Sequence, residues 1–233
     1  MVVTGMMRSF RAVLVLAAVA QWLAACAPTT APDAPPDTLE LPPPARVSGM
    51  ALDEALSRRR SIREYAAQPL TPAEIGQLLW AAQGITNEQG FRTAPSAGAL
   101  YPLELYLLTA AGVFRYEPQD HRLALVSSDD ARNALYQAAL QQDPVRSAPA
   151  VFVLAAVYTR TSEKYGEVRS PRYVHMEAGH AAQNLLLEAT ALGLGAVPIG
   201  AFDDRQVQEA LGLPADHQPL YLIPAGHPSE PGH

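Results

Sequence analysis

The chain has 233 residues, 48% of them hydrophobic, which is enough for one domain with a full hydrophobic core. The formal net charge is -6 at pH 7, so the surface is not of the basic kind that binds nucleic acid. The single cysteine, Cys26, excludes a disulfide within the chain and a cysteine-based metal site.

Residues 1–25 have the layout of a secretory signal. Arg8 and Arg11 precede the apolar run 12–20, which is too short to span a membrane, and the run Leu-Ala-Ala-Cys then ends at Cys26. That run resembles the bacterial lipobox, in which cleavage leaves a lipid-modified cysteine at the new N-terminus. We therefore expect a lipoprotein signal peptide, a lipid on Cys26, and a location on the extracytoplasmic or periplasmic face of the cell envelope. The alternative is an ordinary secretory signal with a chance cysteine.

The next segment, residues 26–46, is rich in proline. Such a segment buries little surface and is predicted to form an extended, semi-rigid tether. One domain is then expected over residues 47–233.

The domain mixes helical and strand patterns without strict alternation, which predicts an α+β fold. The clearest helix follows Thr71: Pro72 occupies its first position, and Glu74, three residues after the cap, completes a capping box. Helices are expected over 48–60, 70–84, 127–142, 177–195 and 203–212, and strands over 103–110, 148–158, 196–202 and 219–226, with a hairpin over 113–127. The polar segment from Thr159 is expected to form a mobile surface loop.

A basic cluster follows the first predicted helix. Guanidinium groups bind phosphate through paired hydrogen bonds, and a serine hydroxyl adds another donor. Taken alone, such a run is more often a solvated face. The cluster consists of Arg59, Arg60, Ser61 and Arg63.

Two other segments are unusually bare of side chains. The run "PSAGALYP" contains Pro95, Ser96 and Ala97, and the run "GLGAVPIGAF" contains Gly200 and Ala201. Small residues leave a backbone accessible to a flat ligand, although each run alone also fits a tight turn.

Together, these three features resemble the nitroreductase family of flavin enzymes, and most closely its SagB-type dehydrogenase branch, which oxidises azolines in peptide-derived natural products. The resemblance extends from about Ala51 to Pro228 and includes "LLWAAQGIT", "RYVHMEAGHAAQNL" and "LYLIPAGHP". It implies the nitroreductase fold, with a central, mainly antiparallel sheet flanked by helices. It also implies a homodimer that binds FMN in a groove between its two subunits.

The resemblance also assigns roles to individual residues. In the family, the positions of Arg59, Arg60, Ser61 and Arg63 hold the phosphate, the ribityl chain and the pyrimidine edge of FMN. Those of Pro95, Ser96 and Ala97 line the isoalloxazine ring, and the backbone at Gly200 and Ala201 faces the reactive flavin nitrogen. Lys164 and Tyr165 match the pair that removes a substrate proton in the SagB-like branch; an exposed lysine in a surface loop is the alternative.

Two departures from the family pattern concern the cofactor. Ala99 stands where many nitroreductases have an asparagine that contacts the flavin. His227 is the candidate cation after the last predicted strand, where many members have lysine or arginine, and a neutral histidine is a weaker phosphate ligand at pH 7.

The run H-x-E-x-x-H, formed by His175, Glu177 and His180, differs from the H-E-x-x-H pattern that places two histidines on one helical face, so no metal is expected. The sequence thus predicts an FMN-dependent oxidoreductase that acts on a small organic substrate. The alternative is a non-catalytic lipoprotein of the same fold that binds flavin weakly.

Overall fold

The computed structural model describes Met1 and residues 37–47 and 49–229. The predicted signal peptide, Cys26 and most of the predicted tether lie outside the described residues. Residues 37–47 and 49–229 belong to one compact unit. In the described part of the chain, no helix is long and apolar enough to cross a membrane.

Seven strands form one sheet, and all of its named strand pairs are antiparallel. Their order is β1-β4-β3-β2-β5-β7-β6. The predicted α+β fold with a mainly antiparallel sheet is confirmed. The strands are β1 (Thr38–Glu40), β2 (Leu103–Thr109), β3 (Gly112–Glu117), β4 (Arg122–Ser127), β5 (Ala150–Val157), β6 (Gly195–Ala196) and β7 (His217–Gly226).

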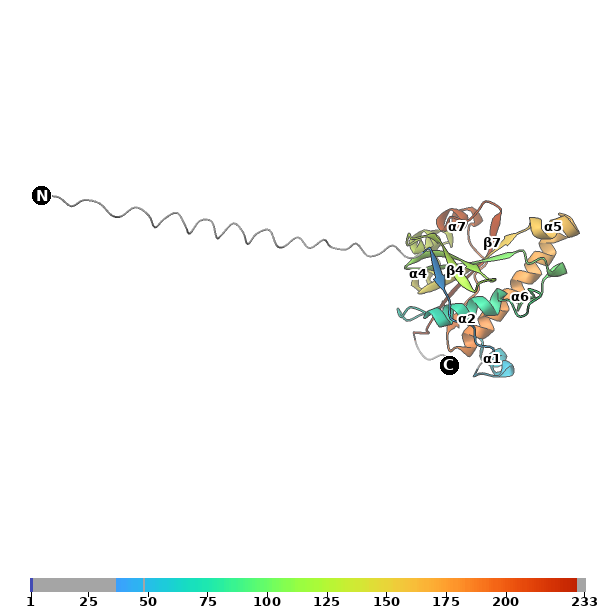
Figure 1. The fold of residues 1–233 in the computed structure, drawn as a ribbon, viewed down its shortest axis with the longest axis horizontal. Helices are drawn as coiled ribbons and strands as arrows, with labels where there is room; N and C mark the ends of the chain where they lie inside the picture. Colours follow the sequence, from blue (N-terminus) through green and yellow to red (C-terminus); the bar gives the residue numbers. More distant parts are fainter. Residues whose placement is uncertain (2–36, 48, 230–233) are drawn as a thin grey trace. The chain divides into compact units, whose positions relative to one another are not determined.

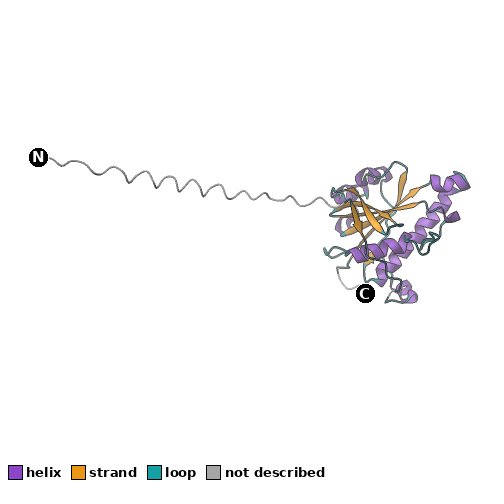
Figure 2. Cartoon of the chain, viewed as in Figure 1, coloured by secondary structure: helices purple, strands orange, loops and turns teal. Residues whose placement is uncertain are grey.

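Helices cover both faces of the sheet (Figures 1 and 2). One hydrophobic cluster joins α2 (Pro72–Gln83) and α6 (Ser170–Ala191) to one face, and a second joins α3 (Arg132–Ala138), α4 (Asp143–Ser147) and α7 (Asp204–Leu211) to the other. β5 serves both clusters, because successive side chains of a strand point to opposite faces: Phe152 and Leu154 belong to the first cluster, Val151 and Val153 to the second. Two short helices, α1 (Leu52–Arg58) and α5 (Thr159–Tyr165), contact α6.

The capping box that the sequence predicts at the start of α2 is confirmed. Thr71 Oγ1 accepts a hydrogen bond from the Glu74 amide at 3.2 Å, and Glu74 Oε2 accepts one from the Thr71 amide at 2.7 Å. Pro72 stands at the first helical position, where its missing N–H costs nothing. Local chemistry therefore fixes where α2 begins.

The structure corrects three predicted elements. The segment from Thr159 is not a loop: it forms α5, and α6 begins at Ser170, seven residues before the predicted start. The helix predicted over 127–142 is limited to α3, and α4 follows it. The strand predicted over 196–202 is reduced to β6 and a bridge at Ile199. Polar residues on the exposed faces of α5 and α6 hide the helical period, which is why the sequence reads as a loop there.

Residues 38–46, which the sequence assigns to the tether, pack on the domain. β1 extends the sheet by pairing with β4, and Leu41 is buried in the core. Beyond β1, the backbone N–H and C=O of Ala45 both bond to the Gln77 side chain on α2, at 2.8 and 3.2 Å, and the Arg46 guanidinium lies over the Trp80 ring. We call residues 38–46 the strap.

Candidate functional site

The basic cluster lies beside the second bare segment. Arg59 ends α1, and the chain then extends so that Ser61 pairs with Ala196 and the Ile62 amide donates to the Ala196 carbonyl at 3.1 Å. The approach requires glycine at position 195, because a Cβ there would lie 2.6 Å from Ile62 Cγ2. Two segments that are distant in the sequence thus form one surface.

A pocket of about 530 Å³ opens at this junction, which is within the usual size range of small-molecule sites. Its lining includes Arg63, Pro198, Gly200 and Ala201. The Arg63 residue is exposed, and among the described residues its guanidinium bonds only to the Ser61 carbonyl, at 3.3 Å. The pocket therefore combines an available cation with a bare stretch of backbone.

Gln142, in the connection before α4, also lines this pocket and was not anticipated from the sequence. Its Nε2 donates to the carbonyls of Ala139 and Ala201, at 2.9 and 2.7 Å. The second bond orients the peptide group between Ala201 and Phe202. The Gly200 and Ala201 amides donate no hydrogen bond within the described residues, so both remain available to a ligand.

The other predicted cofactor residues take different positions. Arg60 is exposed, and its guanidinium donates hydrogen bonds to the nearby backbone carbonyls of Ser57 and Arg59. His227 does not line the pocket; its Nε2 lies 3.5 Å from Glu74 Oε1 at the start of α2. Its predicted role towards phosphate stays a prediction.

The "PSAGALYP" segment forms a tight loop before β2, and none of its residues lines the 530 Å³ pocket. Gly98, Ala99 and Tyr101 have φ values of 65°, 54° and 47°. For Ala99 and Tyr101 this left-handed backbone is unfavourable, so other contacts must hold it. One of these is the Ser96 hydroxyl, which accepts a hydrogen bond from the Tyr101 amide at 2.9 Å.

The predicted proton-transfer pair lies against this loop. A Cβ at Gly98 would stand 2.9 Å from both Lys164 Nζ and Tyr165 Oη, so a side chain at this position would displace the ends of both. Lys164 Nζ also lies 5.6 Å from the centre of the Tyr165 ring, and that ring packs edge-on to Tyr173. The structure thus brings together the Lys–Tyr pair and the loop, which lie about 65 residues apart in the sequence.

Lys164 is also distinguished by the composition of the chain. Of the 17 Lys and Arg residues in the chain, Lys164 is the only lysine. Arginine stays protonated in proteins, whereas a lysine amine can give up and regain a proton. The chain therefore carries its one side-chain ammonium group beside the bare loop.

A buried polar cluster supports the loop from α6. Glu177 is 2% exposed, and the Ser96 hydroxyl donates to its carboxylate. Burial raises the pKa of Glu177 to about 7, and the Ser96 hydrogen bond and the Arg92 guanidinium oppose this rise. Arg92 in turn donates to Gln83 Oε1 at 2.8 Å.

The side chains of the H-x-E-x-x-H run, His175, Glu177 and His180, do not point towards a common site. Glu177 points into the protein, whereas His175 and His180 are exposed, and His175 Nε2 lies 2.7 Å from Tyr158 Oη. No group of three metal-binding side chains occurs among residues 37–47 and 49–229.

The model of the Nitroreductase family matches residues 56–227. The chain belongs to the nitroreductase family. A Methanocaldococcus jannaschii protein named "Putative nitroreductase MJ1384" is 44% identical over 200 residues, which cover 83% of this chain and 99% of that protein.

Two solved structures extend the comparison. One, from Ralstonia eutropha, is also described as a nitroreductase; it has a TM-score of 0.77 and 34% identity, over 84% of this chain and 91% of that one. The other is the NADPH:FMN oxidoreductase of Vibrio harveyi in complex with NAD⁺, with a TM-score of 0.58 and 27% identity, over 77% and 70% of the two chains. Nitroreductases are oxidoreductases that typically bind FMN, and the free amides, the exposed Arg63 and the pocket volume fit a flat, polar-edged ligand of that kind.

Proposed function

We propose that this protein is an FMN-dependent oxidoreductase acting on a small organic substrate. The observation that carries the proposal is the pocket lined by both Arg63 and the residues Gly200 and Ala201, whose amides donate no hydrogen bond within the described residues. Arg59 and Ser61 lie on the same extended segment and would complete the contacts to the phosphate and ribityl chain. Gln142 would hold the end of this backbone segment in place through its bond to the Ala201 carbonyl.

A homodimer completes the site in this proposal. Pro95, Ser96 and Ala97 lie outside the pocket that Arg63 lines, so one chain presents the two halves of a flavin site on separate surfaces. Nitroreductase-fold proteins are commonly homodimers. The bare loop of the partner subunit would then cover the ring held by this one, and a monomer in light scattering that still binds FMN would contradict this arrangement.

FMN, when bound, would accept a hydride from the substrate or donate one to it. The protein's own groups manage the proton: Lys164 Nζ and Tyr165 Oη, placed against Gly98, hold or release it as the substrate changes oxidation state. This role supports assignment to the SagB-type dehydrogenase branch, which we propose as the finer classification. The chain offers one lysine for the task, and removing it by Lys164→Arg would keep the charge but abolish proton exchange.

Flavin binding tests the function directly. The purified protein should show the absorbance of bound flavin, and the flavin-free protein should recover it on titration with FMN. Arg63→Ala should weaken FMN binding by roughly ten- to a hundredfold, because a charge-assisted hydrogen bond contributes about 1.5–3 kcal/mol. Arg205→Ala is the matched control: it removes an exposed arginine on α7, whose partner is Glu209.

A colourless protein that does not bind added FMN would overturn the proposal and favour the non-catalytic alternative. If FMN binds but the Arg63 variant binds it as tightly as the control, the phosphate or pyrimidine edge lies elsewhere.

We also propose that the protein works outside the cytoplasm, held by a lipid on Cys26. Free NADH and NADPH are cytoplasmic carriers, so the physiological reductant would then be the substrate itself or a membrane-bound donor. Slow reduction of the bound FMN by both nucleotides in stopped-flow absorbance is the expected result. Rapid reduction of the bound FMN at micromolar NADH or NADPH would contradict this proposal, because it would show that the site binds a nicotinamide cofactor productively.

A further inference from the structure

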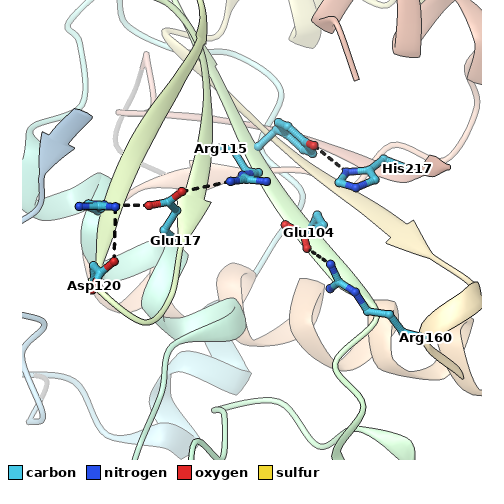
Figure 3. Close-up of polar contacts among 8 residues, drawn as sticks. Glu104, Arg115, Glu117, Asp120, Arg160 and His217 are labelled. Carbon is cyan, nitrogen blue, oxygen red and sulfur yellow. Dashed lines mark hydrogen bonds and ion pairs between the residues drawn. The ribbon is translucent and has the colours of Figure 1, made fainter. Parts of the chain in front are cut away.

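The Arg160 side chain connects α5 with β2 and with the segment just before β2. Its Nη1 donates to the Tyr101 carbonyl at 3.1 Å. Its Nη2 forms an ion pair with Glu104 Oε1 on β2, which Figure 3 shows. The Arg160 side chain is 39% exposed and that of Glu104 is 16% exposed, so the pair is partly shielded from water. One guanidinium group therefore binds both the end of the bare loop and the strand that follows it.

Arg160 and Lys164 lie four residues apart on α5, which places them on the same face of the helix. α5 has only seven residues, and a helix of this length is not stable without tertiary contacts. The position of Lys164 therefore depends on what fixes α5. Arg160 supplies a bond to the same loop, whose Gly98 leaves the space next to Lys164 Nζ free of a side chain.

The loop itself has further supports. The Tyr101 amide donates to Ser96 Oγ, the Tyr101 hydroxyl accepts from the Arg92 amide at 3.2 Å, and the Arg92 guanidinium lies 4.6 Å from the centre of the Tyr101 ring. These three contacts remain when Arg160 is removed. α5 keeps its contacts with α6, including that between the Tyr165 and Tyr173 rings, but loses its bonds to the loop and to β2, so loss of Arg160 should change the position of α5 relative to the loop more than the loop itself.

We propose that Arg160 is a positioning residue, which holds Lys164 and Tyr165 against the flavin-lining loop through its bonds to Tyr101 and Glu104. The inference rests on the proposed function for its catalytic meaning, because it concerns the distance between the proton-transfer pair and the loop. Arg160 itself touches neither group of that pair directly; it acts through α5. Displacement of a reacting group by about 1 Å can cost on the order of a hundredfold in rate, so such a tie matters.

The single lysine permits a direct measurement. Reductive methylation with ¹³C-formaldehyde places labelled methyl groups on Lys164 Nζ and on the N-terminal amine, and nowhere else on the full chain. In the protein without FMN, the Lys164 signal should be displaced by the Tyr165 ring, 5.6 Å away, while the N-terminal signal serves as the reference. Addition of FMN should displace the Lys164 signal again.

Arg160→Met removes the tie without adding a second lysine. In the flavin-free protein, its Lys164 signal should move to the position of a freely mobile dimethyl-lysine, and its displacement by FMN should be lost. FMN affinity should stay within about threefold of the wild-type value, because the pocket with Arg63 is untouched. Glu104→Gln, which keeps the bond from Arg160 to the Tyr101 carbonyl, should shift the signal in the same direction by a smaller amount.

Arg205→Met is the matched control, since it breaks an exposed Arg–Glu pair of the same kind on α7 and should leave the Lys164 signal unchanged. An unchanged Lys164 signal in Arg160→Met, with or without FMN, overturns the inference. A wild-type protein that binds no FMN overturns the proposed function alone, because the flavin-free spectra still decide whether Arg160 positions Lys164.

Discussion

At the scale of single residues, Glu177 is a carboxyl group whose ionisation is opposed by burial. It lies beneath the bare loop with Ser96 and Arg92 as neighbours, and burial raises the pKa of Glu177 from an ordinary value of 4.5 to about 7. The folded state therefore binds this proton more tightly than the unfolded state does. Its contribution to stability is fully present below pH 4.5 and is lost as the pH rises through about 7.

The variant Glu177→Gln should thus gain stability relative to wild type as the pH rises, by up to about 3 kcal/mol between pH 4.5 and pH 8. The glutamine resembles the neutral acid at every pH, so it lacks the penalty of ionising a buried carboxyl group. Urea unfolding at pH 5 and pH 8 measures the change. Glu163→Gln, on the exposed surface of α5, is the control. An equal stability difference at both pH values would contradict the prediction.

At the scale of elements, the strap shows how proline-rich sequence can belong to a fold. Pro42, Pro43 and Pro44 cannot all join a sheet ladder, yet the residues on either side can bond. β1 pairs with β4 before the prolines, and Gln77 bonds both backbone groups of Ala45 after them. The strap is thus fixed at its two ends.

Replacing Gln77 with leucine should free the second end of the strap. The two lost hydrogen bonds contribute about 0.5–1.5 kcal/mol each, and water partly replaces them because Ala45 is exposed. Amide hydrogen exchange at Ala45 should accelerate by about tenfold, which corresponds to about 1.4 kcal/mol. Gln137→Leu on α3, where Gln137 bonds only the exposed Gln141 side chain, serves as the control. Unchanged exchange at Ala45 would show that the strap is held without the Gln77 side chain.

At the scale of the whole molecule, the open matter is where the protein works. Cys26 follows the run Leu-Ala-Ala, which resembles a lipobox. We expect Cys26→Ser to move the protein from the membrane fraction to the soluble fraction and to abolish the mass increase of the lipid. The intact mass of the mature wild-type protein is the companion measurement: an unmodified Cys26, or membrane fractionation that survives the substitution, would refute the anchor.

The sequence by itself determined the features that depend on neighbours along the chain. The capping box at Thr71 and Glu74 and the hairpin of β3 and β4 are local chemistry, and both are confirmed. The fold followed from resemblance, because its motifs extend along most of the domain. The start of α6 was misplaced, because polar residues on its exposed face mask the helical repeat.

Only the tertiary structure decided which distant residues meet. It placed Lys164 and Tyr165 against Gly98, tied α5 to Tyr101 through Arg160, and buried Glu177 beneath Ser96. It also attached the strap to α2. The physical reason is that these contacts join segments separated by tens of residues, and their energies depend on burial and on exact atomic approach. A sequence pattern records which residues are available for such contacts, and packing selects the pairs.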